Sequence, residues 1–336
     1  MERDKYKGID PNIAKELAAY EFRYFRRDEP VPFCGMLIYP ATVKDYESFL
    51  DAMNCLTLDK NTTLAGLKMS NLEYLAQKMS GGGEDPTEGP LWSYRFTRLL
   101  DICLHIKSGY KCPKCGKVLE FGSVEATAAT KLAEESAKTL LAEHPELAAT
   151  EEGIGKLREA ASPKCPVDGD KLEPTVTIRK DEKGKLEFVL DGHVVNSEDF
   201  NRLRQIILFQ NLPDYRDESW VDPALKKDRE MKMELERKNN DVHATVEKKV
   251  VCLSISTHYK FDEIYDMPIR KFSMALSTVD DLINYKITKL AYMTGLVTPP
   301  KGKTLEHWIY KPDKDMYGDD YKSLDSAQAD AAQAGR

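Results

Sequence analysis

The chain has 336 residues, of which 41% are hydrophobic, 31% charged and 9% aromatic, and its formal net charge is −7. This composition excludes a mostly disordered chain, and the length favours two or three domains of ordinary size. The acidic balance argues against a protein that coats nucleic acid, so other proteins are the expected partners.

Seven cysteines are present, and four of them lie in apolar segments where a free thiol packs as a small hydrophobic group: Cys34, Cys55, Cys103 and Cys252. This usage suits a reducing compartment. Residues 1–7 are charged and lack the apolar segment of a signal peptide, and nowhere do 18 apolar residues follow one another. We therefore expect neither a cleaved signal nor a membrane span.

Apolar residues at helical spacing predict several helices in the N-terminal part of the chain. Asp10 and Pro11 open the first of them as an N-cap and a first-turn proline. Ser70 and Glu73 form a capping box for a later one. In chain order the sequence predicts a helix at 11–29, a strand or buried extended piece at 32–40, helices at 42–56 and 70–79, a loop at 81–90 and a helix at 91–106.

The middle of the chain predicts two helices and a β-hairpin. Residues 124–161 are rich in alanine, glutamate and lysine, which favour helices, and His144-Pro145 marks a break between two of them. Alternating residues on either side of the turn at 181–184 predict a hairpin formed by 175–179 and 186–190.

Most of the remaining chain is expected to be helical. A capped helix at 197–211 precedes the densely charged segment 224–249, for which we expect a solvated helix or a linker. Gly295 provides a C-cap for the last of three consecutive helices, at 247–257, 260–276 and 278–294. Beyond them, 307–310 (HWIY) could pack back on the core, and the low-complexity segment 326–336 is expected to form a tail.

Two short cysteine motifs predict a metal site. In Cys112-Pro113-Lys114-Cys115-Gly116, two thiolates on a tight turn can reach one zinc ion at about 2.3 Å, and the glycine relieves the turn. The second motif, Cys165-Pro166-Val167-Asp168-Gly169, repeats this pattern with an aspartate in the place of the fourth ligand, and a carboxylate oxygen is an accepted zinc donor. We therefore predict one structural zinc ion held by Cys112, Cys115, Cys165 and Asp168.

The 49 residues between Cys115 and Cys165 exceed the usual ribbon spacing of about 15 to 20 residues, and the helical insert 124–161 accounts for the excess. Four protein ligands leave no position for water, which indicates a structural ion. A redox C-x-x-C pair and an ion-free ribbon are the alternatives, and His105 or Cys103 could replace Asp168. The loaded site carries a net charge of about −2, which nearby lysines would offset: Lys111, Lys114, Lys117, Lys164 and Lys171.

These elements predict a mainly α fold with small β elements, in which helical N- and C-terminal parts are joined by a zinc ribbon with a helical-hairpin insert. The expected domains are a mostly helical part at 1–108, the ribbon and β-hairpin with their insert at 109–192, a helical part at 193–312 and a flexible tail at 313–336.

No familiar catalytic arrangement is present in the sequence. It contains no G-x-S-x-G, no H-E-x-x-H and no complete phosphate loop, because the triple glycine at 81–83 lacks the lysine and serine or threonine that must follow. The six histidines are dispersed and pair with no obvious nucleophile. We therefore predict a protein that is not an enzyme and has no catalytic residues.

Three segments resemble proteins encoded in the structural-gene regions of tailed bacteriophages: 30–61 (PVPFCGMLIYPATVKDYESFLDAMNCLTLDKN), 203–211 (LRQIILFQN) and 261–297, closed by HWIY. The similarity covers roughly 30–105 and 195–310, and the best match in kind is the tail and baseplate-hub assembly proteins of large phages. The resemblance implies a chaperone or minor virion part, located in the virion or in the host cytoplasm during assembly. The central ribbon departs from the plainer forms of that pattern.

The partners that this resemblance implies are other phage structural proteins, in an assembly that could be oligomeric, with no membrane contact. Zinc ribbons also present their loops to nucleic acid, so a zinc-ribbon nucleic-acid-binding or transcription-associated phage protein is the alternative. Tyr110 and Phe121 are the only aromatic rings near the motifs, which gives little support to stacking on single strands.

Overall fold

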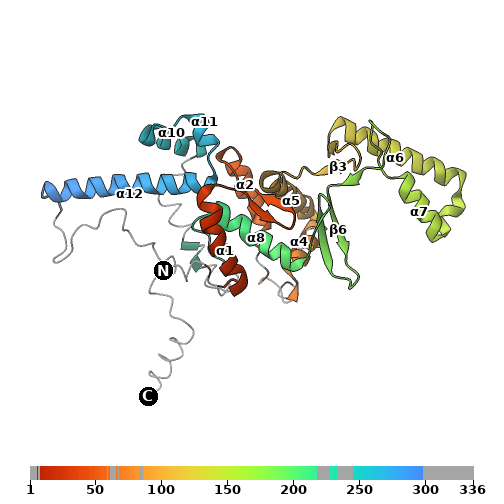
Figure 1. The fold of residues 1–336 in the computed structure, drawn as a ribbon, viewed down its shortest axis with the longest axis horizontal. Coiled ribbons are helices and arrows are strands. Elements are labelled where there is room, and N and C mark those ends of the chain that lie inside the picture. Colours follow the sequence, from red (N-terminus) through yellow and green to blue (C-terminus); the bar gives the residue numbers. More distant parts are fainter. Residues whose placement is uncertain are drawn as a thin grey trace, which may run out of the picture. The chain divides into compact units, whose positions relative to one another are not determined.

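The computed structural model describes residues 8–58, 68–82, 86–217 and 245–297, together with residues 6, 60, 66, 228, 229, 231 and 232. The chain divides into two compact units, Met1–Met274 and Ala275–Arg336. The described part is mainly helical with small antiparallel sheets (Figure 1), as the sequence predicts. Over these residues, no helix combines the length and the hydropathy that a membrane crossing requires. The four domain limits given above stay a prediction.

Helix α1 (Pro11–Arg23) begins where the sequence predicts, because the carboxylate of Asp10 accepts hydrogen bonds from the N–H groups of Asn12 and Ile13. It ends six residues before the predicted limit. A 3-10 turn, η1 (Phe25–Arg27), follows, and Asp28 then takes a left-handed φ of 59°, which no α-helix continues.

The segment 32–40 is not one extended piece but a hairpin of β1 (Val31–Phe33) and β2 (Met36–Ile38). Cys34 and Gly35 form its two-residue turn with φ values of 46° and 80°. Positive φ at both turn residues matches the right-handed twist of the strands. The turn does not follow from the sequence, because Cys34 and Gly35 lie inside a continuous apolar run.

The segment 42–56 is also not a single helix. The short helix α2 (Tyr46–Ala52) lies between two 3-10 turns, η2 (Val43–Asp45) and η3 (Met53–Cys55). A distant segment fixes its start, since the N–H of Val43 donates to the carbonyl oxygen of Met267 at 2.9 Å. The apolar spacing thus predicts helical structure here, but it does not predict where the α-helix begins, because that depends on a long-range contact that no local pattern encodes.

The limits of two further helices lie close to the predicted ones. In α4 (Asn71–Met79), the hydroxyl of Ser70 accepts from the N–H of Glu73, and the N–H of Ser70 donates to the Glu73 carboxylate, which confirms the capping box. After the 3-10 turn η4 (Pro86–Glu88), helix α5 (Gly89–Leu104) ends at His105, whose φ is 54°.

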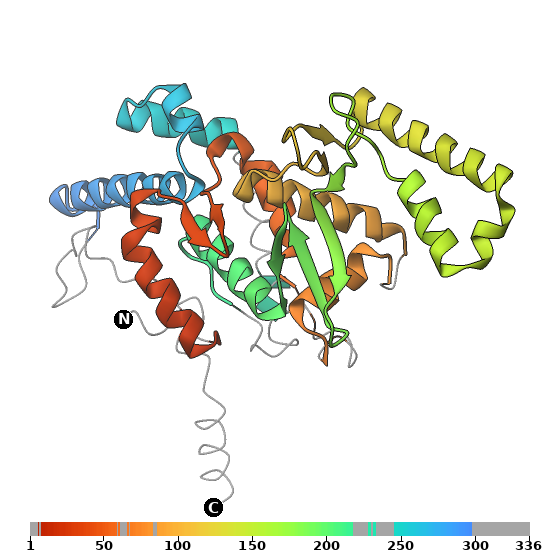
Figure 2. The same ribbon diagram turned by 45° about the vertical axis from the view of Figure 1, so that its right-hand side comes forward.

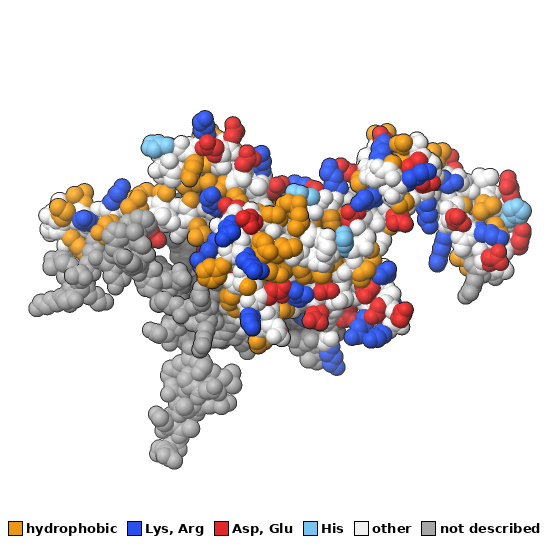
Figure 3. Space-filling view, in the orientation of Figure 1, with side chains coloured by type: hydrophobic (Ala, Val, Ile, Leu, Met, Phe, Trp, Pro, Cys, Tyr) orange, Lys and Arg blue, Asp and Glu red, His pale blue; other side chains and the backbone are white. Residues whose placement is uncertain are grey.

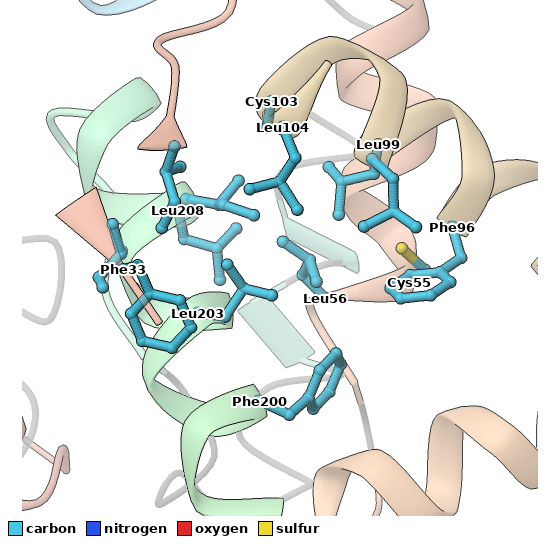
Figure 4. Packing of buried hydrophobic residues seen from close by; sticks show 14 of the residues in the cluster. Phe33, Cys55, Leu56, Phe96, Leu99, Cys103, Leu104, Phe200, Leu203 and Leu208 are labelled. Atoms are coloured by element: carbon cyan, nitrogen blue, oxygen red, sulfur yellow. The ribbon is translucent and has the colours of Figure 1, made fainter. Parts of the chain in front are cut away.

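The main hydrophobic core combines residues from both ends of the first unit. Helices α2, α4, α5 and α8 (Ser197–Asn211) surround it, and Figure 4 shows Leu99 and Leu104 of α5 together with Leu56 and with Leu203 of α8. The Phe188 ring lies 4.9 Å from that of Phe96, measured between centroids, and all these side chains are fully or almost fully buried. Each such side chain stabilises the fold by roughly 1.5–3 kcal/mol.

Two three-stranded sheets occupy the middle of the chain. The first has the order β4-β3-β5, formed by β3 (Gly109–Lys111), β4 (Val118–Glu120) and β5 (Glu173–Pro174). The second contains the predicted hairpin, β6 (Val176–Lys180) and β7 (Leu186–Leu190), and adds β8 (His193–Val195). Strand β8 is not among the predicted elements, although the Asp191-Gly192 turn before it is a strong hairpin signal.

The helical insert is present, with the predicted break. Figure 2 shows its two helices in yellow and yellow-green, α6 (Val124–Glu143) and α7 (Glu151–Ala160), with the 3-10 turn η5 (Pro145–Ala149) between them. Only Ala126 and Ala133 of α6 are buried. The insert therefore owes its helices mainly to their composition and depends on its base for attachment.

The C-terminal helices begin with α10 (Val246–Thr257), as predicted. The predicted break between the next two helices, near residue 277, is wrong. A short helix, α11 (Phe261–Tyr265), ends before Pro268, and α12 (Ile269–Met293) then runs without interruption past residue 277. Proline disfavours helical conformation in the residue before it, which explains the observed break. Most of 224–249 and all of 307–310 and 326–336 lie outside the described residues.

Candidate metal centre

The first cysteine motif forms the turn between β3 and β4. The N–H of Cys112 donates to the carbonyl oxygen of Lys117 at 2.9 Å, and the N–H of Gly116 donates to the carbonyl oxygen of Cys112 at 2.9 Å. Gly116 has a φ of 71°, and nothing lies within 4 Å of where its Cβ would be. The glycine is therefore needed for its backbone conformation and not for space.

The second motif repeats this geometry between the insert and β5. The N–H of Cys165 donates to the carbonyl oxygen of Asp170 at 2.8 Å, and the N–H of Gly169 donates to the carbonyl oxygen of Cys165 at 2.9 Å. Gly169 has a φ of 74°. An antiparallel bridge between Lys164 and Lys171 closes the turn at its base. Two segments far apart in the sequence thus form matching turns.

The two turns bring Cys112, Cys115, Cys165 and Asp168 together in a cluster that could hold a metal ion, with one ligand atom from each residue within 4.8 Å of the others. The sulfurs of Cys115 and Cys165 lie 3.7 Å apart, and the sulfur of Cys112 lies 3.3 and 3.5 Å from the two carboxylate oxygens of Asp168.

These distances agree with one tetrahedral ion. For metal–sulfur bonds of about 2.3 Å and a metal–oxygen bond of about 2.0 Å, neighbouring sulfurs lie about 3.8 Å apart, and a sulfur and an oxygen about 3.5 Å apart. These two pairs of ligand atoms therefore already stand at separations that fit a bound metal, and all four lie within 4.8 Å of one another. The separation of 3.7 Å also shows that Cys115 and Cys165 are free thiols, far from the disulfide distance of about 2.05 Å.

The cluster has a small hydrophobic core of its own. Cys112 and Cys165 are buried together with Leu119, Ala126 and Leu172, whereas Cys115 is exposed. The ring of Tyr110 packs against this group and meets Phe121 edge to face at 5.0 Å between centroids. This small core alone orders few residues, so a bound ion would add much of its stability.

Hydrogen bonds within the cluster shift the pKa values of Asp168 and Cys115. Burial raises the pKa of Asp168, but the N–H of Asp170 and the neighbouring thiols donate to its carboxylate and lower the pKa to about 2. The N–H of Lys117 lowers the pKa of Cys115, but partial desolvation and hydrogen bonds with the side chains of Cys112, Cys165 and Asp168 outweigh it and raise the pKa to about 11. The carboxylate is thus ready to bind a cation, whereas thiol protons must leave when an ion binds.

Three of the five lysines near the cluster form ion pairs with carboxylates outside the four ligand residues. Lys117 pairs with Glu125 at 2.6 Å, Lys114 lies 3.5 Å from Asp170, and Lys111 contacts Asp191. These carboxylates cancel much of the positive charge that was expected to offset a loaded site. For three of the five lysines, that expectation is therefore only partly correct.

Thr175 joins the metal cluster to the main core. Its N–H donates to the carbonyl oxygen of Gly109 at 2.9 Å, and its carbonyl oxygen accepts from the N–H of Asp191 at 2.7 Å. Its hydroxyl accepts from the N–H of Gly109 at 3.0 Å and donates to the carbonyl oxygen of Lys107 at 2.8 Å. The residue is buried, at 4% exposure. It therefore links the β4-β3-β5 sheet to the β6-β7-β8 sheet.

The two alternative ligands lie elsewhere. Cys103 is fully buried in the main core, and the ring of His105 stacks on Tyr39 with centroids 4.0 Å apart. Neither belongs to the cluster. The roles of Thr175 and Asp191 do not follow from the sequence, because their partners lie 66 and 80 positions away. The predicted hairpin includes Thr175 only as a strand residue, and the Asp191-Gly192 pair is the one local signal that could have drawn attention to Asp191.

The comparisons with known proteins give no relative. No family model, no curated protein and no solved structure matches this chain.

Proposed function

We propose that the cluster of Cys112, Cys115, Cys165 and Asp168 holds one zinc ion with a structural role. Three thiolates and a carboxylate suit zinc better than harder cations, which prefer more oxygen ligands. When bound, the ion would supply the cross-link between the two turns at the base of the insert. Four protein ligands leave no coordination position for a reacting water.

The single observation that carries this proposal is the match between the two turns, which places four ligand atoms within 4.8 Å of one another. Elemental analysis of purified protein tests it directly. We expect one zinc per chain in the unaltered protein. The double variant Cys112→Ser, Cys115→Ser should contain no zinc. Cys34→Ser, which alters an exposed cysteine outside the cluster, should retain it. Well under one metal ion per chain in the unaltered protein would rule the site out.

We further propose that the chain is a non-enzymatic structural or assembly protein of a tailed phage, acting in the tail or baseplate through contacts with other phage structural proteins. The support is the resemblance of residues 30–105 and 195–310, together with a surface of mixed charge. On the face shown in Figure 3, basic and acidic side chains are interspersed. Such a surface favours protein contacts over a nucleic-acid track.

Mass spectrometry of purified particles and of tail-protein pull-downs tests this role. We expect the chain in at least one of the two samples, in the virion or with a tail component from the host cytoplasm. Its absence from both would overturn the proposal without affecting the zinc site.

A nucleic-acid-binding role is the second candidate, and one observation favours it. Lys164 and Lys171 are exposed and lie opposite each other beside the second turn. Titration of double- and single-stranded DNA at low and moderate salt discriminates the two roles, because binding to phosphates weakens steeply as salt rises. An absence of binding at low salt eliminates this candidate.

A further inference from the structure

The sulfurs of Cys115 and Cys165 form a second relationship within the cluster. They lie 3.7 Å apart, so each must move by less than about 1 Å to reach the disulfide distance of about 2.05 Å. Both residues lie on turns that contain a glycine in the left-handed conformation, and no atom beyond the adjacent residues lies within 4 Å of the position that a Cβ would take on Gly116 or Gly169. The two turns are therefore not closely packed at these glycines.

The three cysteines of the cluster differ in access. Cys115 is exposed, whereas Cys112 and Cys165 are buried. The sulfur of Cys112 faces the Asp168 carboxylate at 3.3 and 3.5 Å. An exposed sulfur beside a second, shielded sulfur is the arrangement in which an oxidised cysteine is captured as a disulfide. Cys34 and Cys252 are also exposed, but they lie outside the cluster.

We propose that Cys115 and Cys165 are an oxidative modification site whose reactant is hydrogen peroxide. The Cys115 thiolate attacks one peroxide oxygen, the O–O bond breaks and hydroxide leaves, which gives a sulfenic acid on Cys115. The Cys165 thiolate then attacks the Cys115 sulfur, the S–O bond breaks and a second hydroxide leaves. Two thiolates lose two electrons in total, and one peroxide gains them.

This inference rests on the proposed zinc site, because a bound metal keeps its cysteine ligands as thiolates, the nucleophilic form. Once the disulfide forms, only Cys112 and Asp168 remain as ligands, too few to hold the ion. The metal leaves, but the bond between positions 115 and 165 replaces it as the cross-link at the base of the insert. The site thus exchanges a metal cross-link for a covalent one.

Tryptic mapping of the full-length chain distinguishes this disulfide from any other in the cluster. Cleavage after Lys111, Lys114 and Lys164 places Cys112, Cys115 and Cys165 on three separate peptides. Zinc-loaded protein is treated with one equivalent of hydrogen peroxide, and released zinc is measured with a chromogenic chelator. We expect one zinc released for each disulfide, and the peptides of Cys115 and Cys165 joined with the loss of two hydrogens.

Cysteine variants provide the controls. Cys34→Ser and Cys252→Ser alter exposed cysteines outside the cluster and should leave both the disulfide and the zinc release unchanged. Cys165→Ser should abolish the cross-linked peptide and leave Cys115 as a sulfenic or more oxidised acid. Circular dichroism checks that each variant is folded. If a variant does not fold, the peptide map of the unaltered chain still tests the proposed disulfide.

The outcomes separate this inference from the zinc proposal. A chain that binds zinc but joins Cys112 to Cys115, or releases zinc without any disulfide, overturns the inference and leaves the zinc site standing. A chain that binds no zinc overturns the zinc site and with it the proposed reaction of a bound thiolate. Treating that metal-free chain with peroxide would then show only whether the two sulfurs are close enough to form the disulfide without a bound metal.

Discussion

The ammonium group of Lys111 lies 2.7 Å from both carboxylate oxygens of Asp191, 80 positions further along the chain. Lys111 directly precedes the first metal-cluster cysteine, and Asp191 lies in the turn between β7 and β8, next to the main core. Both side chains are about one-third exposed or more, so the pair is worth less than about 1 kcal/mol. The stronger link between cluster and core is therefore Thr175.

Replacement of Thr175 by valine should destabilise the link. Valine keeps the volume of threonine but removes the hydroxyl that contacts Lys107 and Gly109, which leaves a buried N–H and a carbonyl without these hydrogen bonds. We expect a loss of about 1–3 kcal/mol. Urea unfolding of the zinc-loaded protein measures it. The control Thr177→Val lies two residues along on β6, and an equal effect there would show that the hydroxyl of Thr175 has no special role.

Two glycines of α7 should respond to alanine in opposite directions. A Cβ on Gly153 would lie 2.1 Å from the carbonyl oxygen of Leu147, whereas nothing lies within 4 Å of the Cβ position of Gly155. Gly153→Ala should therefore force η5 away from α7 and cost about 1–3 kcal/mol. Gly155→Ala should stabilise the helix by roughly 0.5–1 kcal/mol. Hydrogen exchange of the insert measures both, and a shift of the same sign in both variants would contradict the packing.

The sequence predicts those parts of the site that depend on neighbouring residues. The turns at Cys112 and Cys165 follow from a proline and a glycine at fixed positions, and their similarity identifies Asp168 as the fourth member. The connection through Thr175 does not follow, because its partners meet it only after two sheets have formed. The same reason explains why 42–56 is divided: the carbonyl of Met267, 224 positions away, determines where that helix begins.

Asp168 should be the weakest ligand and the easiest to improve. Asp168→Ala removes one of four donors and should lower zinc affinity by at least about 100-fold, since loss of supporting contacts alone costs 10–100-fold. Asp168→Cys completes two identical C-P-x-C-G turns and should bind zinc at least as tightly as the unaltered chain. Competition with a chromogenic chelator gives both affinities. Equal affinity in all three chains would exclude Asp168 from the metal.

Removal of zinc should affect the insert before the main core. A cross-link between positions 115 and 165 closes a loop of about 50 residues and stabilises it by about 4 kcal/mol in the chain-entropy model. Chelation should therefore expose α6 and α7 to limited proteolysis while the core built around Phe96 and Phe188 stays protected. Identical cleavage patterns with and without chelator would show that no ion supports the insert.

The pair of Glu16 and Arg202 should give the main core part of its pH dependence. Burial raises the pKa of Glu16, but hydrogen bonds from Arg202 and Tyr20 outweigh it and hold the pKa below the ordinary value of 4.5. The guanidinium donates to both carboxylate oxygens, at 2.6 and 3.0 Å. Because the folded pKa is the lower one, this stabilisation is present above pH 4.5 and is lost as the pH falls through the folded pKa.

Glu16→Gln should therefore be less stable than the unaltered chain at neutral pH, by about 1 kcal/mol for a partly exposed bidentate pair. Its deficit should shrink steadily as the pH falls from 4.5 through the folded pKa, because Glu16 of the unaltered chain then becomes uncharged as well. Urea unfolding from pH 7 to pH 3 measures the difference. The control Glu135→Gln changes the same charge on the exposed side of α6 and should show no such trend. A deficit for Glu16→Gln that stays constant across this range would mean that the carboxylate acts through packing alone, and that its charge contributes nothing to the stability of the fold.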